Sequence, residues 1–150
     1  MWSDIVQHSE RLHLLRLCLW GGLSTVVGTL LVVISTVGRA NSPLLRRFGL
    51  LCALLGAIEL IVGAVGYRNV ALRDVSGAAR LDRLAWLQLG LYLGVAGVGA
   101  TLAVTMHRWS RRSDLPVQKA LPILGAGLAI LLHGLGLATL ALFLIADISR

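Results

Sequence analysis

Residues 121–146 read LPILGAGLAILLHGLGLATLALFLIA, a stretch that contains no Asp, Glu, Lys or Arg. The hydrocarbon core of a bilayer is about 30 Å thick, and an α-helix crosses it with about 20 residues that are mostly apolar. The stretch is long enough for that crossing. It therefore predicts a transmembrane helix.

Three further stretches have the same character, and they cover residues 17–38, 48–67 and 84–106. Hydrophobic residues make up 57% of the chain and charged residues 14%, whereas a soluble domain carries about 25% charge. A water-soluble globule is excluded on this ground. The sequence predicts an all-α integral membrane protein, a single transmembrane domain over residues 1–150 that folds as a four-helix bundle with short loops.

The segments around these spans carry further signals. Residues 1–16 place apolar side chains at roughly helical spacing with charged ones between them, which predicts an amphipathic N-terminal lead-in at the membrane interface. Ser42 and Pro43 match the N-cap and first residue of a helix, so the first hairpin turn is expected to be tight. Ser76–Gly77 is expected to precede the third helix. An aromatic belt is predicted near the interface on the side of the termini, from Trp20, Tyr67, Trp86 and Phe143.

The chain has 14 Lys and Arg against 7 Asp and Glu, a net charge of +7. The basic residues lie in the short segments between spans, which favours anionic lipid headgroups as their partners over nucleic acid. Four spans place both termini on one side of the membrane. Lys and Arg divide evenly between the two sides, so the positive-inside rule gives no orientation, and the cytoplasm is taken as the default for the termini.

Small residues recur within each span at spacings that let helices approach closely. In lipid such residues mark helix contacts, because burial of apolar side chains offers no gain there. The sequence therefore predicts helix packing at seven glycines, Gly49, Gly56, Gly63, Gly90, Gly94, Gly125 and Gly136.

Two ionisable residues, Glu59 and His133, lie deep within the predicted spans. Counted from the end that holds segments 39–47 and 107–120, they are about 17 and 19 Å deep, and Thr25 falls near the same level. Both lie on small-residue faces, so we expect them to point at protein and to form a polar cluster with Thr25. In an up-down bundle their helices are diagonal, about 13 Å apart, and the two side chains would just meet across the axis or through one water.

Two readings of this pair stay open. It either specifies the bundle, with Glu59 protonated and bonded to His133, or handles protons or cations, since intramembrane ionisable residues often mark such pathways. A third reading concerns His133 alone. Ala129-x-x-x-His133 resembles the spacing of bacterial light-harvesting helices, where the histidine ligates a pigment, and Gly134 and Gly136 would admit a flat macrocycle or haem.

Other chemistry finds little support in the sequence. The chain has no G-x-S-x-G, H-E-x-x-H or P-loop motif, so an enzyme is not expected, and no metal site is predicted. Cys18 and Cys52 lie near opposite surfaces, about 15 Å or more apart in depth, which is too far for a disulfide.

Ser9-Glu10-Arg11-Leu12 followed by Trp20-Gly21-Gly22, and later Leu91-Tyr92-Leu93-Gly94, resemble a family of small four-span bacterial membrane proteins catalogued as a domain of unknown function. The resemblance implies an architecture and a bacterial inner-membrane location, and it carries no activity. Three functions remain: a structural or accessory subunit or self-associating bundle, a small proton- or cation-coupled transporter that uses Glu59 and His133, and a pigment- or haem-binding subunit.

Overall fold

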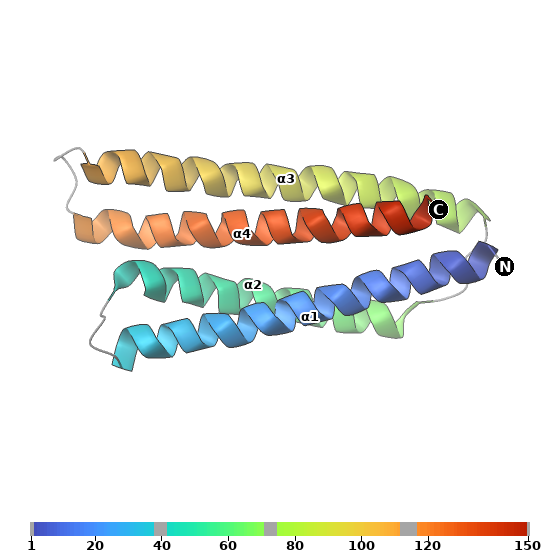
Figure 1. Ribbon diagram of the computed structural model, residues 1–150, viewed down its shortest axis with the longest axis horizontal. Helices are drawn as coiled ribbons and strands as arrows, with labels where there is room; N and C mark the ends of the chain where they lie inside the picture. Colours follow the sequence, from blue (N-terminus) through green and yellow to red (C-terminus); the bar gives the residue numbers. More distant parts are fainter. Residues whose placement is uncertain (1, 38–41, 71–74, 112–116, 150) are drawn as a thin grey trace.

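The computed structural model describes residues 2–37, 42–70, 75–111 and 117–149. These residues form four helices, α1 (Trp2–Val37), α2 (Pro43–Arg68), α3 (Val75–Arg111) and α4 (Val117–Ile148). Figure 1 shows them as a long bundle of near-parallel rods. Each helix contains a segment long and apolar enough to cross a membrane, so the all-α membrane bundle predicted from the sequence is confirmed.

The helices extend beyond the predicted spans. α1 has 36 residues and α3 has 37, which correspond to about 54 and 55 Å at 1.5 Å per residue. The predicted N-terminal lead-in and the first span form one continuous helix, because the lead-in makes up the first turns of α1. Ser76–Gly77 also lies inside a helix, since α3 begins at Val75. The expected start of α2 is confirmed, with Ser42 as N-cap, its side chain accepting from the backbone N–H of Leu45 at 3.5 Å, and Pro43 as first residue.

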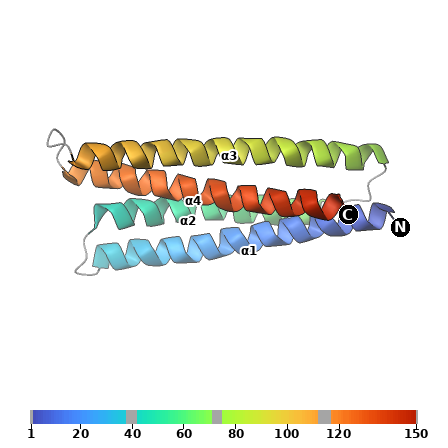
Figure 2. The ribbon, with the colours of Figure 1, turned by 45° about the horizontal axis from the view of Figure 1, so that its top comes forward.

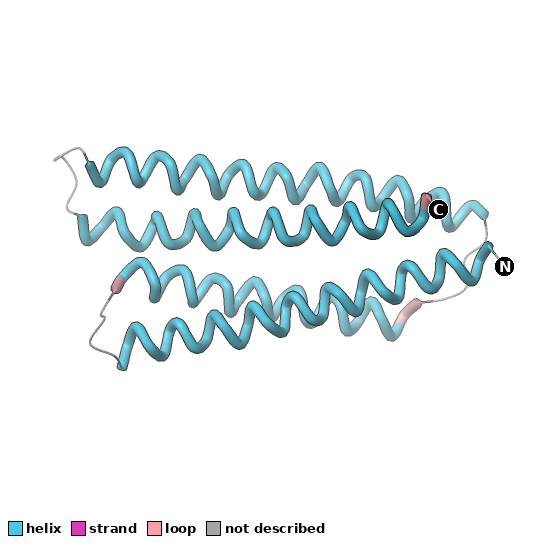
Figure 3. Tube along the Cα trace, viewed as in Figure 1, coloured by secondary structure: helices cyan, strands magenta, loops and turns pink. Residues whose placement is uncertain are grey.

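The chain forms two antiparallel hairpins, α1 with α2 and α3 with α4, that lie side by side (Figures 1 and 2). α4 contacts each of the other three helices, whereas α2 and α3 make no contact among the described residues. The first turn of α1 and the last turn of α4 lie at the same end of the bundle, as the tube in Figure 3 also shows. α4 is thus the central helix.

The expected diagonal separation of the second and fourth helices was wrong. α2 and α4 are direct neighbours that run in the same direction. Gly125 explains this contact, because a Cβ at that position would lie 3.2 Å from the backbone nitrogen of Phe48. The bundle is not square, since α3 lies on the side of α4 that faces away from α2.

Glycine permits the close approach of the two helices in the first hairpin. A Cβ on Gly21 would lie 2.6 Å from the carbonyl oxygen of Gly56, and a Cβ on Gly56 would lie 2.6 Å from that of Gly21. Gly49 and Gly63 face α1 in the same way, against Gly28 and Cys18. Backbone-to-backbone packing of this kind is typical of helix pairs in lipid.

Two of the predicted packing glycines, Gly90 and Gly94, are not helix contacts within this chain. Both are exposed, and a Cβ on either would meet nothing within 4 Å. α3 instead contacts α4 through a neighbouring face. The small residues of that face are Gly99 and several alanines. Alanine is small enough for close helix packing, so the face of α3 that contacts α4 is not the face that carries Gly90 and Gly94. The buried core of this hairpin consists of Ala85, Leu89, Ala138, Ala141, Leu144 and Ile145.

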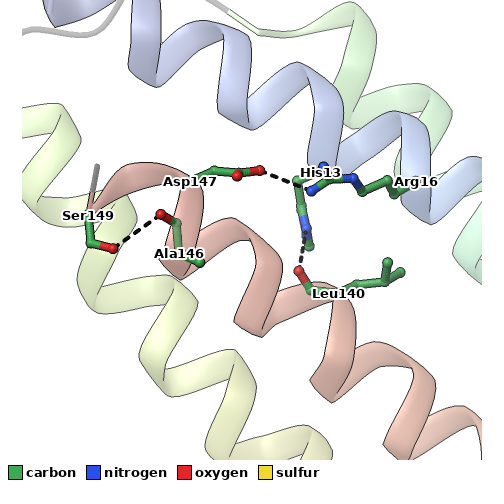
Figure 4. Close-up of polar contacts among 6 residues, drawn as sticks. All are labelled: His13, Arg16, Leu140, Ala146, Asp147 and Ser149. Atoms are coloured by element: carbon green, nitrogen blue, oxygen red, sulfur yellow. Dashed lines mark hydrogen bonds and ion pairs between the residues drawn. The ribbon is translucent and has the colours of Figure 1, made fainter.

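Polar contacts join α1 to α4 near the termini (Figure 4). The Arg16 guanidinium lies 3.0 Å from an Asp147 carboxylate oxygen and above the ring of Phe143. One turn earlier, Nδ1–H of His13 donates to the carbonyl oxygen of Leu140 at 3.2 Å. These contacts hold the fourth and fifth turns of α1 against the last turns of α4.

Candidate functional site

A carboxylate and an imidazole meet inside the bundle, between α2 and α4. Glu59 and His133 are 8% and 2% exposed, and Oε1 of Glu59 lies 2.8 Å from Nδ1 of His133. Glu59 faces inward because it belongs to the buried face of α2, whose members recur every three or four residues. Those members are Gly49, Cys52, Gly56, Glu59 and Gly63.

The contact is direct because the two helices touch. Gly125 packs against α2 beside Phe48, and His133 lies two turns further along the same face of α4. At this level the imidazole lies between the positions of Cys52 and Glu59 on α2. The carboxylate therefore reaches it without a bridging water.

The structure adds two neighbours that the sequence reading did not assign to the cluster, Trp20 and Cys52. The Trp20 ring meets the His133 ring edge to face, with centroids 6.0 Å apart and planes at 68°. The Cys52 thiol, on the same buried face of α2 as Glu59, also lies beside the imidazole. Trp20 was expected in the interfacial belt, which was wrong for a physical reason: α1 begins at Trp2, so residue 20 lies at its middle.

Thr25 does not join the cluster. Its hydroxyl donates to the carbonyl oxygen of Gly21, one turn back in α1, at 2.8 Å. The hydroxyl of Thr25, the expected third member of the cluster, is thus hydrogen-bonded within its own helix, as threonine in apolar helices commonly is. Of the three predicted polar residues, the structure brings together only Glu59 and His133.

Three buried side-chain atoms of this cluster have no hydrogen-bond partner among the described residues: Trp20 Nε1, Glu59 Oε2 and His133 Nε2. They are the only buried side-chain nitrogen and oxygen atoms without a partner in that part of the chain. Buried polar groups are usually bonded, so such a group calls for an explanation. Here all three belong to residues in mutual contact.

Electrostatics restrict how protons are arranged on the pair. A net charge at mid-bilayer costs about 2.5–3.5 kcal/mol on insertion scales and more by other measures, so the pair is neutral overall. The neutral pair carries two exchangeable protons. In two of its forms one proton lies between Glu59 Oε1 and His133 Nδ1, and His133 Nε2 carries the second. In the third form Nδ1–H donates to Oε1 and the other proton is on Oε2. Every form leaves one free donor and one free acceptor, and the Trp20 indole N–H adds a second donor.

The room expected for a haem or pigment beside His133 is taken by protein. Gly134 contacts Ala96 of α3, and a Cβ on Gly136 would lie 2.7 Å from Cε2 of Trp20. Neither glycine therefore leaves the open space that the haem or pigment prediction assumed.

The two cysteines are free thiols in this structure. Cys18 lies in α1 with its sulfur 3.9 Å from the carbonyl oxygen of Leu60, while Cys52 lies two turns before Glu59 in α2. Among the described residues, no three His, Cys, Asp or Glu side chains converge in a way that would hold a metal ion.

A comparison with protein-family models, with curated proteins and with solved structures finds no match to this chain.

We expect Glu59→Gln to leave the free energy of unfolding in bicelles nearly unchanged, because an amide can still bond to His133 Nδ1. Glu59→Ala should lower it by about 0.6–2 kcal/mol, the range measured for hydrogen bonds in membrane proteins. Ile61→Ala is the matched control, since this side chain on α2 is exposed toward lipid. Equal losses for the glutamine and alanine variants would contradict a neutral hydrogen-bonded pair.

Proposed function

We propose that this protein is a non-enzymatic membrane component that acts by association within the bilayer, as a self-associating bundle or accessory subunit. The observation that carries the proposal is the outer face of α3. Gly90, Gly94 and Gly97 follow one another there, and a Cβ on any of them would meet nothing within 4 Å. Other glycines of the helices, such as Gly21, Gly56 and Gly99, contact a neighbouring helix.

The shape of this face supports a helix as its occupant. Gly90 and Gly94 lie in an apolar hollow of about 560 Å³ that Leu91, Val95, Val98 and Ile130 border. Helices in lipid associate where small residues allow their backbones to approach, and the G-x-x-x-G spacing is a known dimer motif.

A second copy of this chain is the favoured partner. Close crossing at a glycine requires small residues on both helices, and α3 offers the same spacing to its own copy. A two-fold axis through the crossing would then bury the hollow of each protomer against the other.

The test is the dimer fraction in lipid vesicles, measured by single-molecule photobleaching across a range of protein densities. Gly94→Ile should weaken association on the order of tenfold, because the branched side chain separates the backbones. Gly22→Ile is the control, since Gly22 on α1 also meets nothing within 4 Å but lacks a glycine partner four residues away. Equal association of both variants and the wild type would overturn the proposal.

The unpartnered atoms of the Glu59–His133 pair favour a second candidate, a proton- or cation-coupled transporter. A pair that only joins two helices gains by bonding all its polar atoms, yet Oε2 and Nε2 have no partner among the described residues. On this alternative, protein in liposomes dissipates an imposed pH gradient, and Glu59→Gln abolishes that flux while the fold persists. Identical decay with wild-type and variant protein would exclude this role.

A further inference from the structure

A crevice lies between α2 and α4 at the end of the bundle where both helices begin, which is the end remote from the termini (Figure 1). Its volume is about 350 Å³. It is lined by Pro43, Arg46, Arg47 and Leu50 of α2 and by Pro122 of α4. The four residues of α2 have the spacing of a single helix face, so the crevice follows that face along the first turns of the helix.

The crossing of the two helices explains why the crevice forms here. Gly125 packs directly against the backbone of Leu44 and Phe48, and Pro122 lies about one turn nearer the start of α4. Because α2 and α4 run in the same direction, the positive ends of their two dipoles lie at this end together. This arrangement adds to the attraction that the arginines exert on an anion.

The charge of the crevice has no compensation within the described part of the chain. Arg46 and Arg47 are exposed, and neither guanidinium forms an ion pair with a described residue. The described acidic residues lie elsewhere, inside the bundle or toward its other end: Asp4, Glu10, Glu59, Asp82 and Asp147. The lining therefore selects an anionic ligand.

The donors and the volume favour a phosphate ester as that anion. A guanidinium presents its N–H groups in a planar fork that matches two oxygens of a phosphate. The volume lies at the lower end of the range of about 300–1,000 Å³ that is usual for pockets that bind small organic molecules. There is thus more room than an inorganic ion fills.

The apolar part of the lining indicates that the ester belongs to a lipid. Leu50 is 40% exposed and lies about 6 Å deeper in the span than Arg46. The arginine side chains can extend along the helix so that their charged ends reach the headgroup level. An amphiphile with an anionic head and acyl chains matches both parts of the crevice, whereas a soluble phosphate ester matches only the arginines.

We propose that this crevice binds the headgroup of an anionic phospholipid, with Arg46 and Arg47 donating to its phosphate and an acyl chain lying along Leu50. Basic pockets between transmembrane helices bind phospholipid headgroups in other membrane proteins. The proposal distinguishes this pair from other basic residues at the same end, such as Arg108 and Arg111 of α3, which do not line the crevice. It does not depend on self-association, because the exposed glycine face lies on α3.

Native mass spectrometry provides the test, since it resolves protein that carries one bound lipid from protein that carries none. The protein in a neutral detergent is titrated with dioleoyl phosphatidylglycerol or with dioleoyl phosphatidylcholine, which has the same chains and no net charge. Each arginine near an anionic headgroup contributes about fivefold to binding. Phosphatidylglycerol should therefore half-saturate a first site at a concentration at least about tenfold lower.

Paired variants separate a site from general surface charge. Arg46→Gln combined with Arg47→Gln should raise the half-saturating phosphatidylglycerol concentration at least about tenfold. Arg108→Gln combined with Arg111→Gln is the matched control, since it removes the same charge from exposed positions at the same end of the bundle and should have a far smaller effect.

A second pair of variants tests the apolar part of the crevice without changing its charge. Leu50→Trp fills the space beside the arginines and should also weaken binding of the first phosphatidylglycerol. Leu54→Trp lies one turn further along α2, outside the lining, and should leave the binding unchanged.

Equal losses in the two arginine pairs would show general attraction by surface charge and would overturn the proposal, as would equal binding of the two lipids. Displacement of the lipid by glycerol 3-phosphate at the same concentration would assign the crevice to a soluble phosphate ester instead. Circular dichroism and gel filtration of each variant confirm that the bundle is folded.

Discussion

The hydrogen bond between Glu59 of α2 and His133 of α4 joins two hairpins in a setting where few other forces do so. Lipid chains are as apolar as the side chains of the spans, so helices gain little by burying leucine or valine against each other. Within each hairpin, glycine and alanine make up for this small gain, because they let the helix backbones touch. Between α2 and α4 the contact combines one glycine, Gly125, with the polar pair.

The position of α4 follows from this arrangement. It contacts the other three helices and carries His133, while α3 lies on its far side and exposes a glycine face. The same helix thus connects the interior polar cluster to α3, whose outer glycine face is the one proposed for association. At the terminus end, Arg16 with Asp147 and His13 with Leu140 close α1 onto α4, which keeps Trp20 against the imidazole (Figure 4).

Much of the fold could be predicted from the sequence, because length and hydropathy determine which segments can cross a bilayer. The depth of Glu59 and His133 also followed from residue counting, since the rise of a helix is constant. The neighbour relations of the helices could not be predicted, because small-residue patterns occur on all four and do not say which pair each one serves. Gly90 and Gly94 illustrate the difficulty, because α3 packs against α4 through alanines on the adjacent face.

The cluster around the pair was harder to predict for two reasons. Trp20 was placed at an interface because α1 was taken to start near residue 17, and the earlier start moves it to mid-helix. Thr25 has the right depth, but its hydroxyl bonds to the carbonyl of Gly21. Depth and helix face therefore select candidates, and hydrogen-bond competition within the helix decides among them.

The central claim is that Glu59 and His133 form a direct, neutral hydrogen bond inside the bilayer. Solid-state NMR of protein labelled with ¹³C at glutamate and ¹⁵N at histidine, in lipid bilayers, measures the dipolar coupling between the Glu59 carboxyl carbon and His133 Nδ1 directly. The account predicts a strong coupling, with no net charge on the pair at neutral pH. Assigned signals of both residues without a coupling would contradict it.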